Sequence, residues 1–374
     1  MVERVARAYL SFMNGSAMGP SPQGTPFSAA QWLTLTRRAW LGAALAAGAT
    51  ALNHAAAAAQ IGAVAKPAAP RMAYTSTLQP ASIPPAYLER VALLCEFPVR
   101  EKGEATWTQG VSINKGAKEV YVSNQNGTQL RIDVRKLPSG VRKSSRTVKT
   151  QDLCWTEALP WFYNKRGHLC FIIRATGGAR ANSSTYAIYN YTTGSKGANI
   201  AIKGMWRADV AGKYMVTTDA WTTSVKNFYL YDWRSVQAGT PRLVSTIPAQ
   251  GGAKTAGKNQ GMACVGNYFF LIQGNPSQSP TFQAWDANGK LVLSRKYTRA
   301  DFRDLVNKLK PGYLTNAKYA YEAEGAFNLD GKLVSVQIVN NNPSVITDGR
   351  VLVLQHNRID GVRGKMQPAK PPGQ

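Results

Sequence analysis

The chain has 374 residues, and its 45 Lys and Arg against 20 Asp and Glu give a formal net charge of +25 at pH 7. Its three histidines and four dispersed cysteines provide little material for a Ser-His-Asp triad, a His-rich metal site or a Cys-x-x-Cys zinc site. No phosphate loop, Gly-x-Ser-x-Gly elbow or His-Glu-x-x-His pattern occurs, so no metal or cofactor is expected.

The first 59 residues are typical of a bacterial export signal. Arg37-Arg38 precedes an uncharged Ala, Gly and Leu stretch over 42–52, and small residues at 55–59 suit a signal peptidase. The apolar stretch is shorter than the roughly 20 residues of a membrane-spanning helix, which favours a cleaved signal over a retained anchor. We expect export by the twin-arginine route, with the ordinary secretion route as the alternative because Trp40 stands where Phe is usual. Both routes predict a secreted or envelope-associated protein that meets the membrane only through its signal.

Almost all of the positive charge lies after the signal, because residues 1–59 hold only four arginines and Glu3. A field of this sign attracts polyanions. Outside a bacterial cell these are phosphate-bearing wall polymers, acidic glycans and anionic lipid headgroups, with nucleic acid as a further class. The alternative is that dispersed Lys and Arg only keep the protein soluble.

Composition divides the remainder into three parts. Residues 60–86 are rich in Ala and Pro and predict a linker, and residues 361–374 predict a disordered tail of similar character. Residues 87–360 between them have a suitable size for a single β domain.

Short apolar runs separated by Gly, Asn and Asp predict strands throughout this domain. The first set of runs is 120–122, 169–173, 214–216, 268–272 and 333–336, and a further strand follows each, at 130–134, 186–189, 228–232, 282–286 and 351–354. Only 299–309 has apolar residues at helical spacing. The fold class is therefore all-β with one short inserted helix.

The strands repeat as five units. A glycine precedes each run of the first set, at Gly116, Gly167, Gly212, Gly266 and Gly331, with a period of about 45 to 65 residues. Repeated antiparallel hairpins predict a β-propeller, with five blades as the count and four or six as the alternatives. The segment 87–97 supplies a strand that closes the ring with the last blade, because closure removes exposed edges.

Two segments resemble a known family. Residues 258–263 (Lys-Asn-Gln-Gly-Met-Ala) leading into 266–272, with Tyr321-Glu-Ala-Glu-Gly-Ala-Phe327 further on, resemble the teichoic acid biosynthesis protein C and helveticin J family, which includes propeller domains of phage receptor-binding proteins. Residues 107–111 (Trp-Thr-Gln-Gly-Val) look like another copy of the Gln-Gly blade. The resemblance implies a five-bladed propeller that acts at bacterial envelopes, by binding wall glycopolymer or as an antibacterial protein.

Five residues are expected near one end of the propeller axis, because innermost strands line the central channel. They are Gln109, Trp161, Trp206, Gln260 and Glu324. In the functional interpretation the amides and the carboxylate bind hydroxyls or phosphate while the tryptophans stack on sugar faces. In the structural interpretation these side chains hydrogen-bond adjacent blades and hold the ring together.

Glu322 and Glu324 alternate along the start of a strand. They could perform acid–base chemistry if a second carboxylate faced them, for which Asp209 and Asp219 are candidates. Few such acids occur, so the sequence favours a binding protein over an enzyme.

Basic residues are densest at Arg131, Arg135, Lys136, Arg142, Lys143 and Arg146. This cluster is either a solvated face or a contact for a polyanion.

The function predicted from the sequence is a secreted, monomeric β-propeller that binds an anionic cell-envelope polymer or glycan without cleaving it. The alternatives are a hydrolase or lyase of such a polymer and a bacteriocin-like antibacterial protein. No specific nucleic-acid partner is expected.

Overall fold

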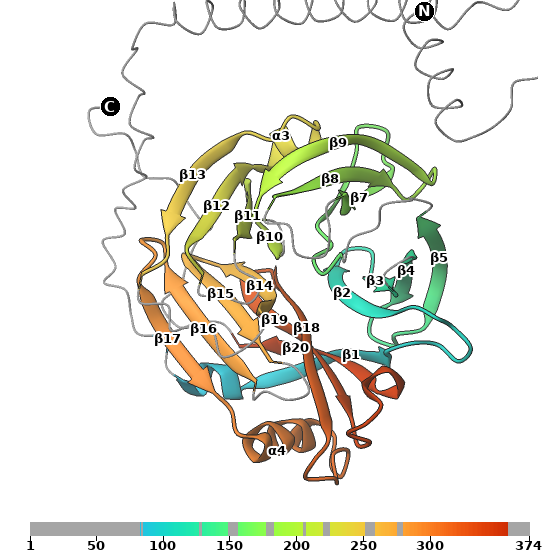
Figure 1. The fold of residues 1–374 in the computed structure, drawn as a ribbon. Coiled ribbons are helices and arrows are strands. Elements are labelled where there is room, and N and C mark those ends of the chain that lie inside the picture. The colour runs from blue at the N-terminus through green and yellow to red at the C-terminus, as the bar shows by residue number, and fades with distance from the viewer. Residues whose placement is uncertain are drawn as a thin grey trace, which may run out of the picture. The chain divides into compact units, whose positions relative to one another are not determined.

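The protein is a five-bladed β-propeller, as predicted (Figure 1). The computed structural model describes residues 83, 85–126, 129–148, 156–176, 183–204, 207–219, 225–250, 259–274 and 280–357. The predicted signal region, nearly all of the linker and the tail lie outside these residues. No described helix is long and apolar enough to cross a membrane.

Each blade is a four-stranded antiparallel sheet with one edge strand nearest the centre of the ring (Figure 1). From the centre outwards, blade 1 consists of β2 (Trp107–Asn114), β3 (Glu119–Gln125), β4 (Leu130–Lys136) and β5 (Arg142–Val148). Blade 2 consists of β6 (Trp161–Tyr163), β7 (Leu169–Thr176), β8 (Ser183–Asn190) and β9 (Ser195–Lys203). Blade 3 consists of β10 (Ala208–Ala211), β11 (Tyr214–Thr218), β12 (Asn227–Asp232) and β13 (Leu243–Pro248). Blade 4 consists of β14 (Asn259–Val265), β15 (Tyr268–Gln273), β16 (Thr281–Asp286) and β17 (Leu291–Lys296). Blade 5 consists of β18 (Ala320–Leu329), β19 (Lys332–Asn340), β20 (Arg350–His356) and, outermost, β1 (Val91–Pro98).

The two ends of the domain close the ring together. Strand β1 pairs antiparallel with β20, from Val91 opposite His356 to Pro98 opposite Arg350. The short 3-10 helix η1 (Pro85–Glu89) precedes it and buries Tyr87 and Leu88. The predicted closing strand is confirmed, and it gives β20 a partner along its outer edge.

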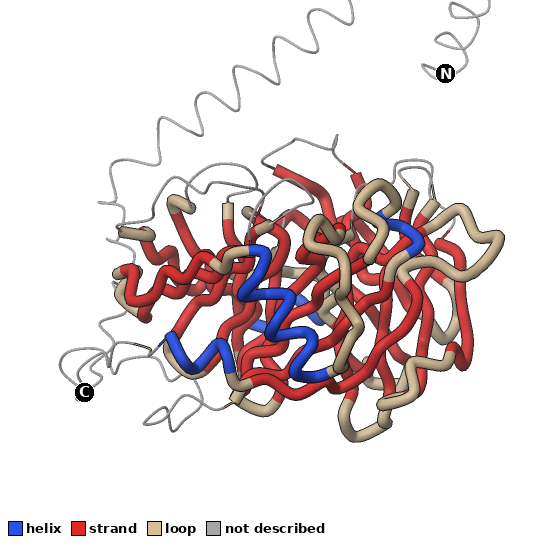
Figure 2. The backbone as a smooth tube through the Cα atoms, turned by 90° about the horizontal axis from the view of Figure 1, so that it is seen from below, coloured by secondary structure: helices blue, strands red, loops and turns tan. Residues whose placement is uncertain are grey.

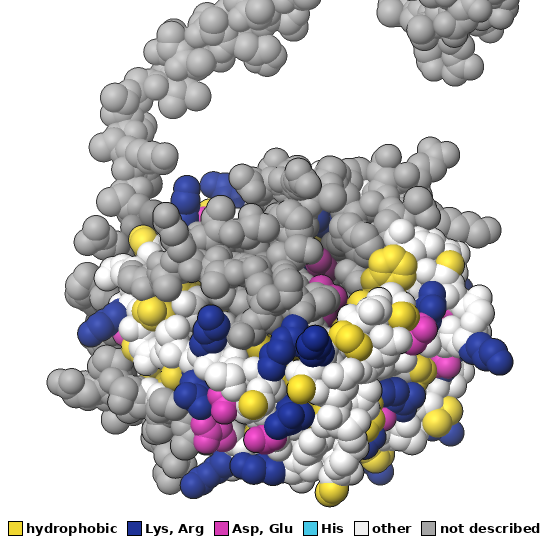
Figure 3. All heavy atoms as spheres, turned by 60° about the horizontal axis from the view of Figure 1, so that its bottom comes forward, with side chains coloured by type: hydrophobic (Ala, Val, Ile, Leu, Met, Phe, Trp, Pro, Cys, Tyr) yellow, Lys and Arg dark blue, Asp and Glu magenta, His cyan; other side chains and the backbone are white. Residues whose placement is uncertain are grey.

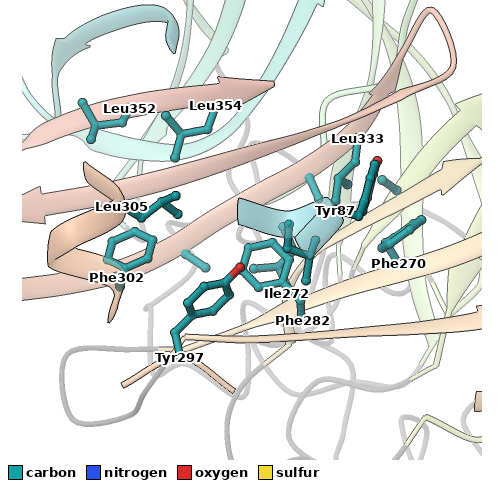
Figure 4. Packing of buried hydrophobic residues seen from close by; sticks show 14 of the residues in the cluster. Tyr87, Phe270, Ile272, Phe282, Tyr297, Phe302, Leu305, Leu333, Leu352 and Leu354 are labelled. Carbon is teal, nitrogen blue, oxygen red and sulfur yellow. The ribbon is translucent and has the colours of Figure 1, made fainter. Parts of the chain in front are cut away.

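Helix α4 (Arg299–Leu309) lies on the outside of the strands (Figure 2). Its bounds match the predicted helical window. Thr298 and Asp301 form a capping box at its start, which satisfies two backbone N–H groups. Figure 4 shows Phe302 and Leu305 of this helix beside Leu352 and Leu354 of blade 5, in the hydrophobic cluster between blades 4 and 5.

Three short helices in the described part of the chain were not predicted from the sequence. They are η1, α3 (Trp233–Gln237) and the 3-10 helix η2 (Ile346–Asp348). All three are too short for an apolar period to develop, and α3 depends on a local cap in which Asp232 accepts a hydrogen bond from the Ser235 N–H.

The cysteines of the described residues are core side chains. Cys95, Cys170 and Cys264 are buried and form no disulfide. Cys154 lies outside the described residues.

Candidate functional site: the central channel

Three innermost strands carry a β-bulge at the same level of the channel. The pairing register skips one residue between Thr108 and Gly110, between Asn259 and Gly261, and between Ala323 and Gly325. The extra residues are Gln109, Gln260 and Glu324, all buried. A bulge re-aims the side chain that it inserts. The Gln-Gly and Glu-Gly pairs of the sequence therefore mark the same kind of β-bulge in three blades.

The glycines after these bulges allow the inner strands to approach each other. A Cβ on Gly261 would lie 2.8 Å from the Cα of Gly325 and still closer to the backbone of Ala326. A Cβ on Gly110 would lie 2.9 Å from the carbonyl oxygen of Glu157. These contacts bring the backbones of neighbouring blades together beside the bulges.

A chain of polar contacts crosses the channel beside the bulges. Arg207, whose side chain is 1% exposed, forms an ion pair with Glu157. Its Nη2 donates to Gln260 Oε1 at 2.8 Å, and Gln260 Nε2 donates to Glu322 Oε1 at 2.9 Å. We call Glu157, Arg207, Gln260, Glu322 and Glu324 the channel network.

The channel network has more acid than base. Burial lowers the pKa of Arg207, and the nearby carboxylates of Glu324 and Glu322 oppose that shift. Three carboxylates thus face one guanidinium inside a strongly basic protein, and the channel at this level disfavours an anion.

A cavity of about 360 Å³ occupies the part of the channel nearer the inner hairpin turns. Its lining includes Trp161, Phe327, Ser112, Asn114, Glu157 and Asp209. Glu322 and Glu324 do not belong to this lining, since β18 contributes only residues from Gly325 onward.

Trp161 lies among polar and aromatic groups. Its ring is half-buried and packs edge-on against Tyr121, with ring centroids 5.3 Å apart, and against Tyr163 at 5.9 Å. Asn114 Nδ2 donates to the hydroxyls of both tyrosines, at 3.1 and 3.2 Å. At the neighbouring hairpin turns, Lys115 of blade 1 forms an ion pair with Asp330 of blade 5.

Asp209 joins three blades from the wall of the cavity. Its Oδ2 accepts from the N–H of Cys264 at 2.7 Å and from that of Asn328 at 2.9 Å. Burial raises the pKa of this carboxyl to about 7, against the effect of the backbone donors. An aspartate within the apolar run Ala208–Ala211 was the sequence signal for such a buried acid.

The predicted channel residues have different positions. Gln109 Nε2 donates to the carbonyl of its neighbour Thr108 at 3.0 Å, whereas Gln260 and Glu324 belong to the channel network. Trp161 lines the cavity, closer to the hairpin turn than the bulges are, and Trp206 lies outside the described residues. Asp219 follows β11 and accepts hydrogen bonds from the N–H groups of Lys226 and Asn227 beside the start of β12.

Sequence reasoning missed Glu157 and Arg207. Arg207 directly precedes the short inner strand β10, and Glu157 lies four residues before the start of the short inner strand β6. The apolar pattern of such strands is too brief to assign a position to the residues beside them.

Most of the predicted basic cluster is engaged in ion pairs. Arg131, Arg135 and Arg142 share the carboxylates of Asp133, Glu101 and Glu104, and Arg135 is only 2% exposed. Lys143 pairs with Glu119. Lys136 is exposed, and Arg146 donates to the Thr192 carbonyl at 3.0 Å.

No protein-family profile matches the sequence, and no curated protein sequence matches it. Among solved structures, the tail fiber of Staphylococcus aureus phage P68 is similar with a TM-score of 0.43 and 10% identity, over 73% of this chain and 54% of the fiber. A GH43 glycoside hydrolase is similar with a TM-score of 0.41 and 11% identity, over 69% of this chain and 51% of the enzyme. A luciferin-regenerating enzyme has a TM-score of 0.35 and 12% identity, over 74% and 99%. The chain thus spans about half the length of the first two proteins, and the likeness concerns the fold alone.

Proposed function

We propose that this protein is an exported binding protein that holds a sugar-containing segment of an anionic envelope polymer in its central cavity without cleaving it. The observation that supports this most directly is the cavity itself, which combines the rings of Trp161 and Phe327 with the hydrogen-bonding groups of Ser112 and Asn114. Sugars present an apolar ring face and several hydroxyls, and such a lining complements both.

The cavity has room for a sugar residue. Its volume of about 360 Å³ falls within the range of small-molecule sites. The Oγ of Ser112 is buried without a hydrogen-bond partner among the described residues. A buried hydroxyl without a partner is costly, so a ligand hydroxyl at this point would recover a hydrogen bond.

The distribution of charge on the protein assigns the sugar and the anionic groups of the proposed ligand to two different regions. The charged groups that line the cavity are Glu157, Asp209 and the Lys115–Asp330 ion pair, so the lining has no excess of positive charge and suits the uncharged sugar better than a phosphate. The basic exterior attracts the anionic groups of the same polymer and raises its local concentration.

The positions of the carboxylates favour binding over hydrolysis. Glu322 already accepts a hydrogen bond from Gln260, and Glu324 is 4% exposed. Asp209 Oδ2 is held by two backbone N–H groups. A catalytic acid or base needs access to the reacting group, and these contacts restrict it.

The test measures binding and polymer length in the same samples. Protein from Gln60 onward is titrated with a sugar-substituted glycerol-phosphate oligomer and with the matching neutral glycan. We expect Trp161→Ala to weaken both interactions by about tenfold, because an aromatic wall is lost. Leu243→Ala, at a partly exposed position on outer strand β13, is the control and should bind normally.

Two results would contradict the proposal. Unchanged binding of the neutral glycan by Trp161→Ala would exclude the cavity as its site. Shortened oligomer in the wild-type reaction, restored to full length by Asp209→Asn or Glu324→Gln, would establish the hydrolase or lyase alternative.

A further inference from the structure

A second cavity lies at the outer rim between blades 1 and 2. It has a volume of about 480 Å³, and its lining includes Arg146, Thr147, Tyr189, Thr193, Gly194 and Lys196. We call it the rim groove. Arg146 and Thr147 come from the outermost strand β5, and the other four residues come from β8, β9 and the turn between them. The groove is separate from the channel, since the two linings share no residue.

The rim groove differs from the rest of the basic cluster in its charge balance. Arg131, Arg135 and Arg142 are compensated by buried or half-buried acids, and Lys143 by Glu119. In the described part of the chain, neither Arg146 nor Lys196 forms an ion pair with a carboxylate, and no acid belongs to the groove lining. The groove therefore retains two positive charges.

The arginine of the groove is held in place. Its Nη2 donates to the Thr192 carbonyl at 3.0 Å, and the guanidinium lies over the ring of Tyr191, 5.7 Å from the centroid. Gly194 makes room for it, because a Cβ there would lie 2.9 Å from Nη1, and its φ of +79° favours glycine. A fixed guanidinium loses less side-chain entropy when it binds an anion.

The groove also offers a hydroxyl group. Thr193, in the turn between β8 and β9, is exposed, and its hydroxyl shares a hydrogen bond of 2.7 Å with that of Ser195. Donors thus approach from two blades at different angles. A tetrahedral phosphate, whose oxygens point in several directions, suits this arrangement better than a planar carboxylate.

We propose that the rim groove binds a phosphodiester group of a polyol-phosphate polymer, through Arg146, Lys196 and the Thr193 hydroxyl. This inference deepens the proposed function, on which it rests for the choice of polymer, by assigning the anionic part of the ligand to a site outside the channel. Single-stranded nucleic acid is the weaker candidate, because the aromatic rings nearest the groove, Tyr189 and Tyr191, are buried and cannot stack on bases.

The experiment compares charge-matched variants of the whole exported chain. A synthetic glycerol-phosphate oligomer without sugar is titrated by calorimetry into the wild type, Lys196→Gln and Lys318→Gln. Both lysines are exposed and both variants lose one charge, but Lys318 precedes β18 and lies outside the groove lining. We expect Lys196→Gln and Arg146→Gln each to weaken binding on the order of tenfold, as for loss of a charge-assisted hydrogen bond. Lys318→Gln should stay close to the wild type.

Three outcomes would overturn the inference. Equal weakening by Lys196→Gln and Lys318→Gln would mean that the general field attracts the polymer without a site. Tighter binding of a single-stranded DNA of equal charge would assign the groove to nucleic acid, and tighter binding of oligogalacturonate would assign it to carboxylates.

Failure of the two proposals can be separated with Trp161→Ala. If this variant keeps its affinity for the sugar-free oligomer while Lys196→Gln loses it, the groove is supported whatever the cavity binds. If only Trp161→Ala loses the oligomer, the groove proposal is wrong and the cavity is the polymer site.

Discussion

At the scale of single residues, two buried titratable groups change the stability of the fold with pH in opposite directions. Burial raises the pKa of Asp209 to about 7 and lowers that of His356 to about 4. A folded state that holds the Asp209 proton loses stability as the pH rises from about 4 to 7, because the unfolded chain has already released that proton. His356 acts in the other direction, since its contribution is lost as the pH falls from 6.5 towards 4.

Asp209→Asn isolates one of these effects. Asparagine keeps an oxygen for the N–H groups of Cys264 and Asn328 but has no proton to release. The free energy of unfolding of the variant, relative to the wild type, should therefore rise with pH by up to about 1.4 kcal/mol per unit between pH 4 and 7. Urea unfolding at four pH values in this range measures the difference, in which the contribution of His356 cancels. A difference that does not vary with pH would show that Asp209 is ionised throughout.

At the scale of elements, the inner strands depend on the glycines beside the bulges. Gly261 lies against Gly325 and Ala326 of the neighbouring blade, so a methyl group there meets backbone that cannot rotate away. Gly116, in the turn between β2 and β3, has ordinary φ and only a contact at 3.6 Å for an added Cβ.

Gly261→Ala should lower the free energy of unfolding by about 1 to 3 kcal/mol through overpacking, whereas Gly116→Ala should change it little. Chemical denaturation of the two variants measures the contrast. Equal free energies of unfolding for the two variants would mean that the blades can separate slightly without cost. The close approach of β14 to β18 would then contribute nothing to stability.

Elements of this fold could be predicted because their signals are local. The hairpin repeats, the closing strand and helix 299–309 each follow from a short run of residues, and all were confirmed. The cavity could not be predicted, because it exists only where β2, β6, β10 and β18 meet. No short sequence pattern indicates that Trp161 and Asp209 line the same cavity. The basic cluster shows the same limit, since Glu101 and Glu104 reach Arg135 and Arg142 from another part of the chain.

At the scale of the whole molecule, the sign of charge changes from the channel to the exterior. The channel network has an acid excess, while the net charge of the chain is +25. Figure 3 shows Lys and Arg spread over one face, with Asp and Glu beside several of them. In the proposed function, the exposed charges of the exterior attract the anionic groups of the polymer, and the cavity holds its sugar through shape and hydrogen bonds.

Salt should separate the two contributions. Between 50 and 500 mM NaCl, affinity for the glycerol-phosphate oligomer should fall by about tenfold or more, because exposed charges are screened over a few ångströms at high salt. Affinity for the neutral glycan should change less than twofold, since aromatic contact and hydrogen bonds are little screened. Parallel salt dependences for both ligands would argue against a division between rim groove and cavity.

The pairing of β1 with β20 also affects the time at which the protein can fold. The first strand of the domain finds its partner only when residues 350–356 have been synthesised, more than two hundred residues later. At translation rates of about 5 to 20 residues per second, this delay is on the order of ten seconds to a minute. A chain that ends before residue 350 therefore has no closed ring, and its last blade lacks a strand. Only a molecule that extends through residue 356 can hold β1 in the sheet of blade 5.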